Sequence, residues 1–191
     1  MGISLEKGQK VSLDKIAPGI KAGFIGLGWD INDSDTGTSF DLDASIFLLG
    51  ADEKLISDQH FIFYNNLVSP DEHGSIKHMG DNLTGAGEGD DEVIIVDFRK
   101  VPENIHRITI TVTIHKADER KQNFGQVENA FVRVVDVETQ NEVLRYDLNE
   151  DFSVETALIM AEIYRRNGEW RVNAVGKGYE GGLAALLNRY Q

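Results

Sequence analysis

Residues 40–46 read FDLDASI and residues 107–115 read RITITVTIH, and the pattern of these two stretches decides the fold. In the first stretch, Phe, Leu, Ala and Ile at even-numbered positions alternate with Asp41, Asp43 and Ser45. In the second stretch, Ile and Val alternate with Thr in the same way. Alternation with a period of two is typical of a β-strand that buries only one face. Both stretches are therefore predicted to be strands with one face in the core.

Most of the remaining periodic segments also have the composition of short strands. They cover residues 22–29, 61–64, 93–98, 130–137, 143–148 and 170–175, with turn-forming Asp, Gly and Asn residues between many of them. Helix is predicted only late in the chain, at 155–166 after the cap Ser153 and at 183–190, while 116–121 reads as a turn or short helix. The pattern predicts a mainly β protein, a two-sheet β-sandwich with a few short helices toward the C-terminus.

The composition fits one soluble domain spanning residues 1–191. A hydrophobic fraction of 41% is enough to form a core, and 27% charged residues argue against a membrane-embedded chain. The absence of cysteine excludes disulfides and thiolate chemistry. The sequence has neither an apolar signal core at its start nor an apolar run long enough to cross a bilayer. We therefore expect a cytoplasmic protein without an integral membrane segment.

The negative charge is concentrated in two segments, residues 30–43 (DINDSDTGTSFDLD) and 81–92 (DNLTGAGEGDDE). Together they hold ten acidic residues and no Lys or Arg, in a chain of net charge -13. Two carboxylates about 4 Å apart near a surface repel by roughly 4 kcal/mol, so such density favours a counter-ion. Calcium accepts carboxylate, amide and carbonyl oxygens in irregular loops, and glycines help such a loop to bend. These segments predict a metal site; the alternative is a solvated acidic surface.

The expected strands indicate how these acids could come together. Asp41 and Asp43 lie two residues apart, so both side chains point to the same face of their strand. Asp30 ends the preceding apolar strand and could reach the same end of the sandwich. Asn65 follows another strand and could add an amide oxygen, although a turn is the alternative interpretation of that position.

Other kinds of site find little support in the sequence. Neither acidic segment has the spacing of an EF-hand, and the Gly-rich segment lacks the Lys-Ser/Thr of a phosphate-binding P-loop. There is no HExxH zinc motif and no GxSxG nucleophile motif. A metal-dependent phosphoester hydrolase remains the enzymatic alternative, since clustered carboxylates can hold catalytic metals. No run of Lys and Arg forms a basic stripe, so a nucleic-acid partner is not expected.

Several motifs resemble those of the TerD family of tellurite-resistance and stress proteins, over essentially the whole chain. They are GLGWD (26–30), FDLDAS (40–45), FYNN (63–66), GDNLTGAGEGDDE (80–92) and FGQVENAFVRVVD (124–136). The resemblance implies a non-enzymatic calcium-binding β-sandwich with two Ca²⁺ ions near one end. It also implies a role in tellurite resistance and stress response, with partners among other stress-response proteins of the same system, including membrane-associated ones. Some relatives are described as cyclic-nucleotide binders, which leaves a second binding function open.

The resemblance also implies a set of metal ligands. They are Asp41, Asp43, Asp81, Asn82, Glu88, Asp90 and Asp91, with Thr84, Gly87 and Glu92 as backbone or secondary contributors and Asp30 and Asn65 as additions.

Overall fold

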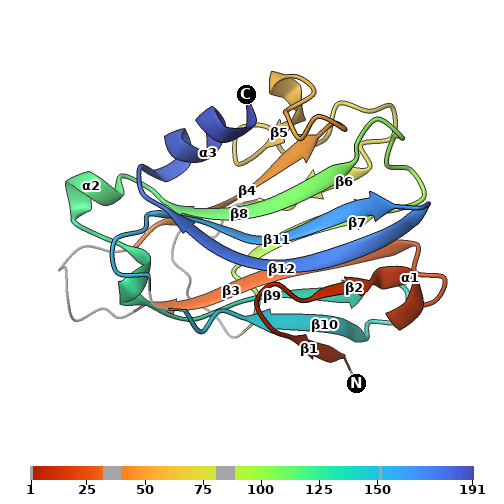
Figure 1. The fold of residues 1–191 in the computed structure, drawn as a ribbon, viewed down its shortest axis with the longest axis horizontal. Helices are drawn as coiled ribbons and strands as arrows, with labels where there is room; N and C mark the ends of the chain where they lie inside the picture. The colour runs from red at the N-terminus through yellow and green to blue at the C-terminus, as the bar shows by residue number, and fades with distance from the viewer. Residues whose placement is uncertain (1, 32–39, 81–88, 151) are drawn as a thin grey trace.

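The computed structural model describes residues 2–31, 40–80, 89–150 and 152–191 of the chain. In this part of the chain, two six-stranded sheets stack as a β-sandwich, which confirms the predicted fold (Figure 1). Neighbouring strands are antiparallel, except that the first strand runs parallel to its only neighbour. The short helices lie at the ends and edges of the two sheets.

The two sheets contain strands from distant parts of the sequence. Sheet A has the order β1 (Ile3–Leu5), β10 (Glu142–Asp147), β9 (Val127–Asp136), β3 (Ala22–Ile31), β7 (Glu92–Asp97) and β6 (Ile76–His78). Sheet B has the order β2 (Lys10–Ser12), β12 (Glu169–Tyr179), β11 (Ala157–Arg166), β8 (Arg107–Ile114), β4 (Leu42–Leu49) and β5 (Phe61–Ile62). The helical segments are α1 (Leu13–Ile16), η1 (Asp58–His60), α2 (Ala117–Arg120), η2 (Phe124–Gln126) and α3 (Gly182–Tyr190).

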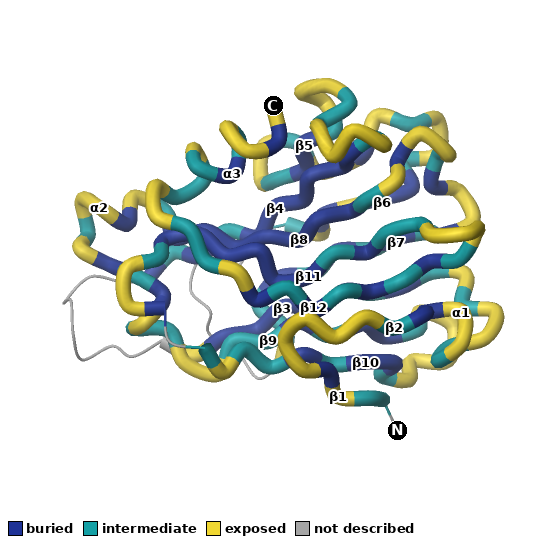
Figure 2. The backbone as a smooth tube through the Cα atoms, viewed as in Figure 1, coloured by how far each residue is buried: buried dark blue, intermediate teal, exposed yellow. Residues whose placement is uncertain are grey.

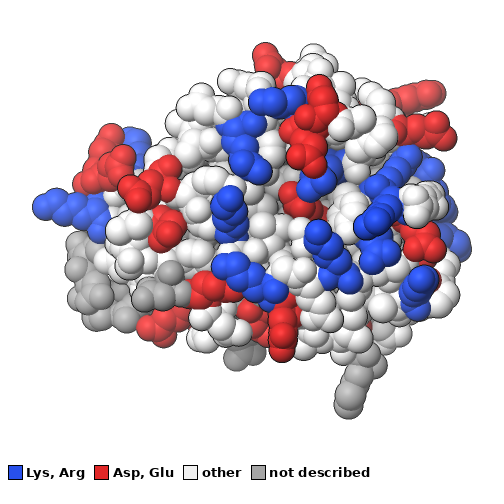
Figure 3. Space-filling view, in the orientation of Figure 1, with Lys and Arg blue, Asp and Glu red and all other residues white. Residues whose placement is uncertain are grey.

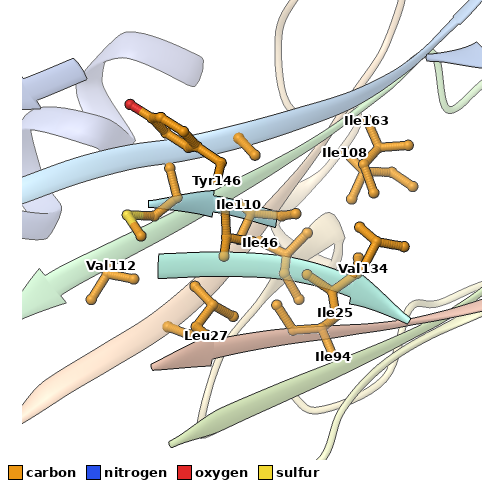
Figure 4. Close-up of a cluster of buried hydrophobic side chains, with 14 of the residues drawn as sticks. Ile25, Leu27, Ile46, Ile94, Ile108, Ile110, Val112, Val134, Tyr146 and Ile163 are labelled. Atoms are coloured by element: carbon orange, nitrogen blue, oxygen red, sulfur yellow. The ribbon is translucent and has the colours of Figure 1, made fainter. Parts of the chain in front are cut away.

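The main hydrophobic core fills the space between the two sheets (Figure 4). The even-numbered side chains of β4 and β8, such as Ile46 and Ile110, point into this space as the alternation predicts. They pack with Ile25 and Leu27 of β3, and all four side chains are at most 1% exposed. Burial of this apolar surface is the main favourable term that holds the sheets together.

A second hydrophobic cluster lies on the other face of sheet B, beneath helix α3. Phe47 and Leu49 of β4 occupy odd-numbered positions, yet both are fully buried there. Figure 2 shows most of β4 in the dark blue of buried residues. The ring of Phe47 lies 4.7 Å from the ring of Phe61 and 4.9 Å from that of Tyr190 at the end of α3. The polar face expected for this strand is therefore limited to its first half, which leaves Asp43 near the end of the sheet.

The helix predicted at residues 155–166 is wrong, because residues 157–166 form β11. This strand lies between β8 and β12, and its first half, residues 157–161, is buried on both faces. Leu158 and Ile163 enter the main core, whereas Ile159 packs in the cluster under α3. A register shift between Ile159 and Ala161 also interrupts the alternation. A continuous apolar run buried on both faces cannot be distinguished from a helix by periodicity.

Asp71 organises the loop that leads from β5 to β6. Its carboxylate accepts hydrogen bonds from Ser69 Oγ, from the backbone N–H of His73 at 3.1 Å and from Ser75 Oγ at 2.9 Å. Burial acts to raise the pKa of Asp71, but these hydrogen bonds outweigh it and hold the pKa below its ordinary value.

We expect Asp71→Asn to make the protein less sensitive to acid. A carboxyl whose pKa is lower in the folded state stabilises the fold above the unfolded pKa of about 3.9. That stabilisation is lost as the pH falls through the folded pKa. Urea unfolding from pH 7 to pH 3 should show a difference between wild type and variant that shrinks with decreasing pH. The exposed neighbour Glu72, changed to Gln, is the control, and an equal response from both variants would contradict the role of Asp71.

Candidate metal site

Asp30 of the first acidic segment and Asp91 of the second lie together where β3 ends and β7 begins, because these strands are neighbours in sheet A. The backbone N–H of Asp91 donates to the carbonyl of Leu27 at 2.7 Å. In return, the backbone N–H of Trp29 donates to Asp91 Oδ2 at 2.8 Å. Asp30, the next residue, therefore lies beside Asp91, although the two are far apart in the sequence.

The carboxylates at this junction repel one another. Burial raises the pKa of Asp91, and the nearby charges of Asp30 and Asp90 raise it further, while the hydrogen bond from Trp29 lowers it. A raised carboxyl pKa means that the negative charge is disfavoured in the folded chain. At this junction the buried carboxylate of Asp91 therefore experiences unfavourable charge from Asp30 and Asp90.

Two glycines in β3 leave room for side chains of the site. A Cβ at Gly26 would lie 2.2 Å from a carboxylate oxygen of Asp90, and a Cβ at Gly28 would lie 2.4 Å from the ring of Phe131. Both distances are far below van der Waals contact. The glycines of the GLGWD motif therefore allow the side chains of Asp90 and Phe131 to lie close against the backbone of β3.

Asp90 forms an ion pair with an arginine, Arg133, that the sequence did not reveal as its partner. Arg133 Nε lies 2.8 Å from Asp90 Oδ1, and Arg133 Nη2 lies 2.7 Å from Asp90 Oδ2, so the pair is bidentate. The Asp90 side chain is only 6% exposed. Arg133 belongs to β9, which pairs with β3, so the missing counter-charge comes from another strand. It lies within the motif FGQVENAFVRVVD, which was the one available signal in the sequence.

We expect Arg133→Met to destabilise the protein by roughly 3 kcal/mol, since it leaves a buried carboxylate without its partner. The control is Arg99→Met, because Arg99 makes a similar two-bond pair with Asp97 but is itself 56% exposed. Exposed pairs contribute little, so this control should unfold at nearly the wild-type urea concentration. If both variants unfold alike, the Asp90–Arg133 pair has no special structural role.

Asp41 and Asp43 lie at the start of β4 and face residues around α2. Asp41 Oδ2 lies 3.8 Å from an Nη atom of Arg120, and Asp43 Oδ2 lies 3.9 Å from Nδ1 of His115. Asp41 Oδ1 is buried and accepts no hydrogen bond from the residues that the structure describes. This oxygen therefore has unused capacity to bind a cation or a donor.

Glu92 is buried between the sheets at the same end of the molecule. Its Oε2 lies 3.0 Å from Nε2 of His78, and both side chains are 1% exposed. The same His78 nitrogen lies 3.2 Å from the carbonyl of Ala44, which follows Asp43 in β4. His78 thus connects Glu92 at the start of β7 in sheet A to Ala44 near the start of β4 in sheet B, at one end of the sandwich.

The other predicted ligands are distributed as follows. Asn65 lies at the exposed tip of a tight turn between Phe63 and Asn66, as the alternative interpretation of that position predicted. Asp81, Asn82, Thr84, Gly87 and Glu88 lie outside the described residues, so their predicted role stays a prediction. Within the described ranges alone, no group of three or more Asp, Glu, His or Cys side chains is arranged to hold a metal ion.

A polar pocket of about 450 Å³ opens beside Asp30 and Asp91. One wall is formed by Phe131 and Arg145, whose guanidinium carbon lies 3.7 Å from the ring centroid of Phe131. Arg145 Nε is hydrogen-bonded to Asp147 at 2.7 Å. The pocket therefore combines carboxylates on one side with an arginine held by stacking on the other.

The chain belongs to the TerD family, because the TerD domain model matches residues 1–190. It is 57% identical over 190 residues to general stress protein 16U of Bacillus subtilis, covering all of this chain and 97% of that protein. It is 53% identical over 190 residues to tellurium resistance protein TerD of Serratia marcescens, again covering all of this chain and 97% of the relative. The family expectation from the sequence motifs is thereby confirmed.

Solved structures support the same fold. The crystal structure of a homologue of telluride resistance protein (TerD) from Streptomyces coelicolor matches with a TM-score of 0.69 at 22% identity. The match covers 88% of this chain and 96% of that structure. In addition, none of the helices in the described ranges is long and apolar enough to cross a membrane.

Proposed function

We propose that the protein is a non-enzymatic calcium-binding module of a cytoplasmic stress-response system, of the kind that confers resistance to tellurium compounds. Relatives named for general stress and for tellurium resistance support the biological setting. The observation that carries the calcium proposal is the junction of Asp30, Asp90 and Asp91, where burial and like charges raise the pKa of Asp91. A divalent cation would relieve that repulsion.

The donor chemistry at this end of the sandwich fits calcium. The available groups are carboxylates and backbone carbonyls, the oxygen donors that calcium prefers, and the described residues include a buried oxygen of Asp41 that accepts no hydrogen bond. Asp30 and Asp91 at sheet A, and Asp41 and Asp43 at the start of β4, would contribute oxygens to two calcium ions, which would supply positive charge. Asp90 is held by Arg133 in this structure, so we expect it to contribute less than Asp91.

Isothermal titration calorimetry on chelator-treated protein tests this proposal. Calcium should bind with measurable heat, while magnesium should bind more weakly because it requires stricter octahedral geometry. The proposal would be contradicted if calcium produced no heat and no change in the near-ultraviolet circular dichroism spectrum of the protein.

A second candidate function is the binding of a small phosphate ligand such as a cyclic nucleotide. The pocket beside Asp30 favours it, because Arg145 is stacked on Phe131 and its Nη atoms make no hydrogen bond with described residues. Equilibrium dialysis with a cyclic nucleotide, with and without calcium, tests this function. Retention of the nucleotide by wild type but not by Arg145→Gln would support it.

A further inference from the structure

The outer face of sheet B carries a cluster of positive charge that is not visible in the sequence. Arg107 of β8, Tyr164 of β11 and Arg171 of β12 are cross-strand neighbours in one row. The residues that alternate with them, including Ile108 and Val172, enter the core, so this row faces outward. Cations thus flank an aromatic ring on the open side of the sheet.

Further cations extend this surface, which we call the basic face. It consists of Lys10, Arg107, Arg166, Arg171, Lys177 and Arg189. Lys10 is placed there by its pairing with Asn173 in β12, and Lys177 by its pairing with Ile159 in β11. Arg189 lies on α3, 5.8 Å from the ring centroid of Tyr179. Figure 3 shows Lys and Arg side chains spread over the middle and the right of the side that it views, with some Asp and Glu side chains among them.

Much of this positive charge is not neutralised within the described part of the chain. Arg107 is paired with Glu53 and Glu162, at 2.8 and 2.7 Å. Arg166 and Lys177 are exposed and form no ion pair with described residues. An acidic protein of net charge -13 thus has one face on which six cations outnumber the acids Glu53, Glu162 and Glu169, and Glu169 lies opposite Arg166 in the strand register.

The acidic remainder of the molecule does not cancel this face at physiological salt. Stacked sheets lie about 10 Å apart, so acids on the outer side of sheet A are farther from the basic face than that spacing. The Debye length at physiological ionic strength is about 8 Å. A flat anionic surface placed against sheet B would therefore experience mainly the local positive charge.

We propose that the basic face binds the anionic headgroups of a phospholipid bilayer, as a peripheral and reversible contact. The face combines the part of the outer side of sheet B that α3 leaves open with Arg189 of α3 itself. The large exposed apolar side chains, such as Leu67, Val68 and Met79, lie outside the strands of sheet B, so the contact is electrostatic and does not require insertion. Tyr164, in the middle of this face, has an amphipathic ring that suits the headgroup region.

The arrangement of the aromatic rings favours lipid over single-stranded nucleic acid. Base stacking needs open ring faces. Here the guanidinium of Arg107 lies 5.7 Å from the ring centroid of Tyr164, and Lys177 Nζ lies 5.3 Å from that of Tyr179. Because these cations lie over the ring faces, a partner would contact positive charge and would find little open ring surface for base stacking.

Co-sedimentation with vesicles tests the proposal without relying on the calcium site. The protein is mixed, in chelator, with phosphatidylcholine vesicles that contain or lack phosphatidylglycerol. We expect binding only to the anionic vesicles, lost at high salt and at least tenfold weaker for Arg166→Glu/Lys177→Glu. The matched control is Lys21→Glu/Lys77→Glu, which changes the net charge equally but lies on the side of sheet A.

Several outcomes would overturn this inference. They are no binding in chelator, binding that appears only with calcium, and equal losses for the two double variants. Binding of a single-stranded oligonucleotide in place of the vesicles, lost in the Arg166→Glu/Lys177→Glu variant, would overturn it in favour of a nucleic-acid partner. Thermal melting verifies that each variant is folded, and Arg166→Gln/Lys177→Gln replaces the charge-reversed variant if that one does not fold.

Discussion

Calcium is expected to raise the melting temperature of the metal-free protein by about 5–10 °C when its free concentration is 100 times the dissociation constant. At that concentration, one site that binds only the folded state adds about 2.7 kcal/mol of stability. For a chain of this length, each kcal/mol corresponds to roughly 2–4 °C in melting temperature. Differential scanning calorimetry with a calcium series measures the shift, and a melting temperature that does not move with calcium would contradict it.

Asp91→Asn should slightly raise the melting temperature of the metal-free protein but reduce the further rise that calcium causes. The pKa of Asp91 is raised in the fold, so its ionised form destabilises the folded state, and this penalty grows as the pH rises through the folded pKa. Asparagine removes the charge and keeps an oxygen that can accept the hydrogen bond from Trp29. The metal-free variant should therefore melt slightly above the wild type at pH 7, while its response to calcium should be much smaller.

Two further variants show whether that response is local. Asp43→Asn should also reduce the calcium shift, because Asp43 belongs to the first acidic segment at the same end of the fold. Asp58→Asn removes an exposed carboxylate from η1, outside both segments, and should keep the full shift. Equal reductions in all three variants would indicate general charge screening in place of a defined ion site.

The largest loss of stability from a single core substitution is expected for Phe47→Ala, at about 3–5 kcal/mol. Phe47 is 0% exposed and its ring contacts those of Phe61 and Tyr190. The substitution would remove both aromatic contacts and leave a cavity between sheet B and α3. Urea denaturation measures the loss, and limited proteolysis should show earlier cleavage within α3.

The control for this prediction is Tyr64→Ala, which deletes an aromatic ring that is 45% exposed. Its contact is an edge-on approach to Phe63, and such pairs contribute about 1 kcal/mol. If the two variants lose similar stability, the cluster under α3 does not anchor the helix as the structure indicates.

The fold was predictable because the alternation of apolar and polar residues shows which face of a strand is buried. In the stretches 40–46 and 107–115, each side of the strand has its own chemistry, so period-two alternation reports the two faces directly. The prediction was wrong at residues 157–166, because the first half of this strand, residues 157–161, is buried on both faces. There Leu158 packs between the sheets and Ile159 packs under α3, so the sequence contains no polar side to reveal a strand.

The candidate site was predictable in its composition but not in its internal pairing. The acids themselves are evident in the sequence, and the structure brings Asp30 and Asp91 together. The two segments themselves contain no base, but in the structure Arg133 pairs with Asp90 and Arg120 approaches Asp41. Both arginines are remote in the chain, and only the pairing of β9 with β3 and the position of α2 bring them near.

The sequence by itself determined the β-sandwich, the family and the concentration of acid in two segments, because each depends on the local order of residue types. Only the tertiary structure decided which charges are neighbours, since Coulomb interactions depend on distance in space and not on separation along the chain. The same principle explains the basic face of sheet B, whose cations come from four different strands and a helix. No run of the sequence contains them, yet the antiparallel register places them on one surface.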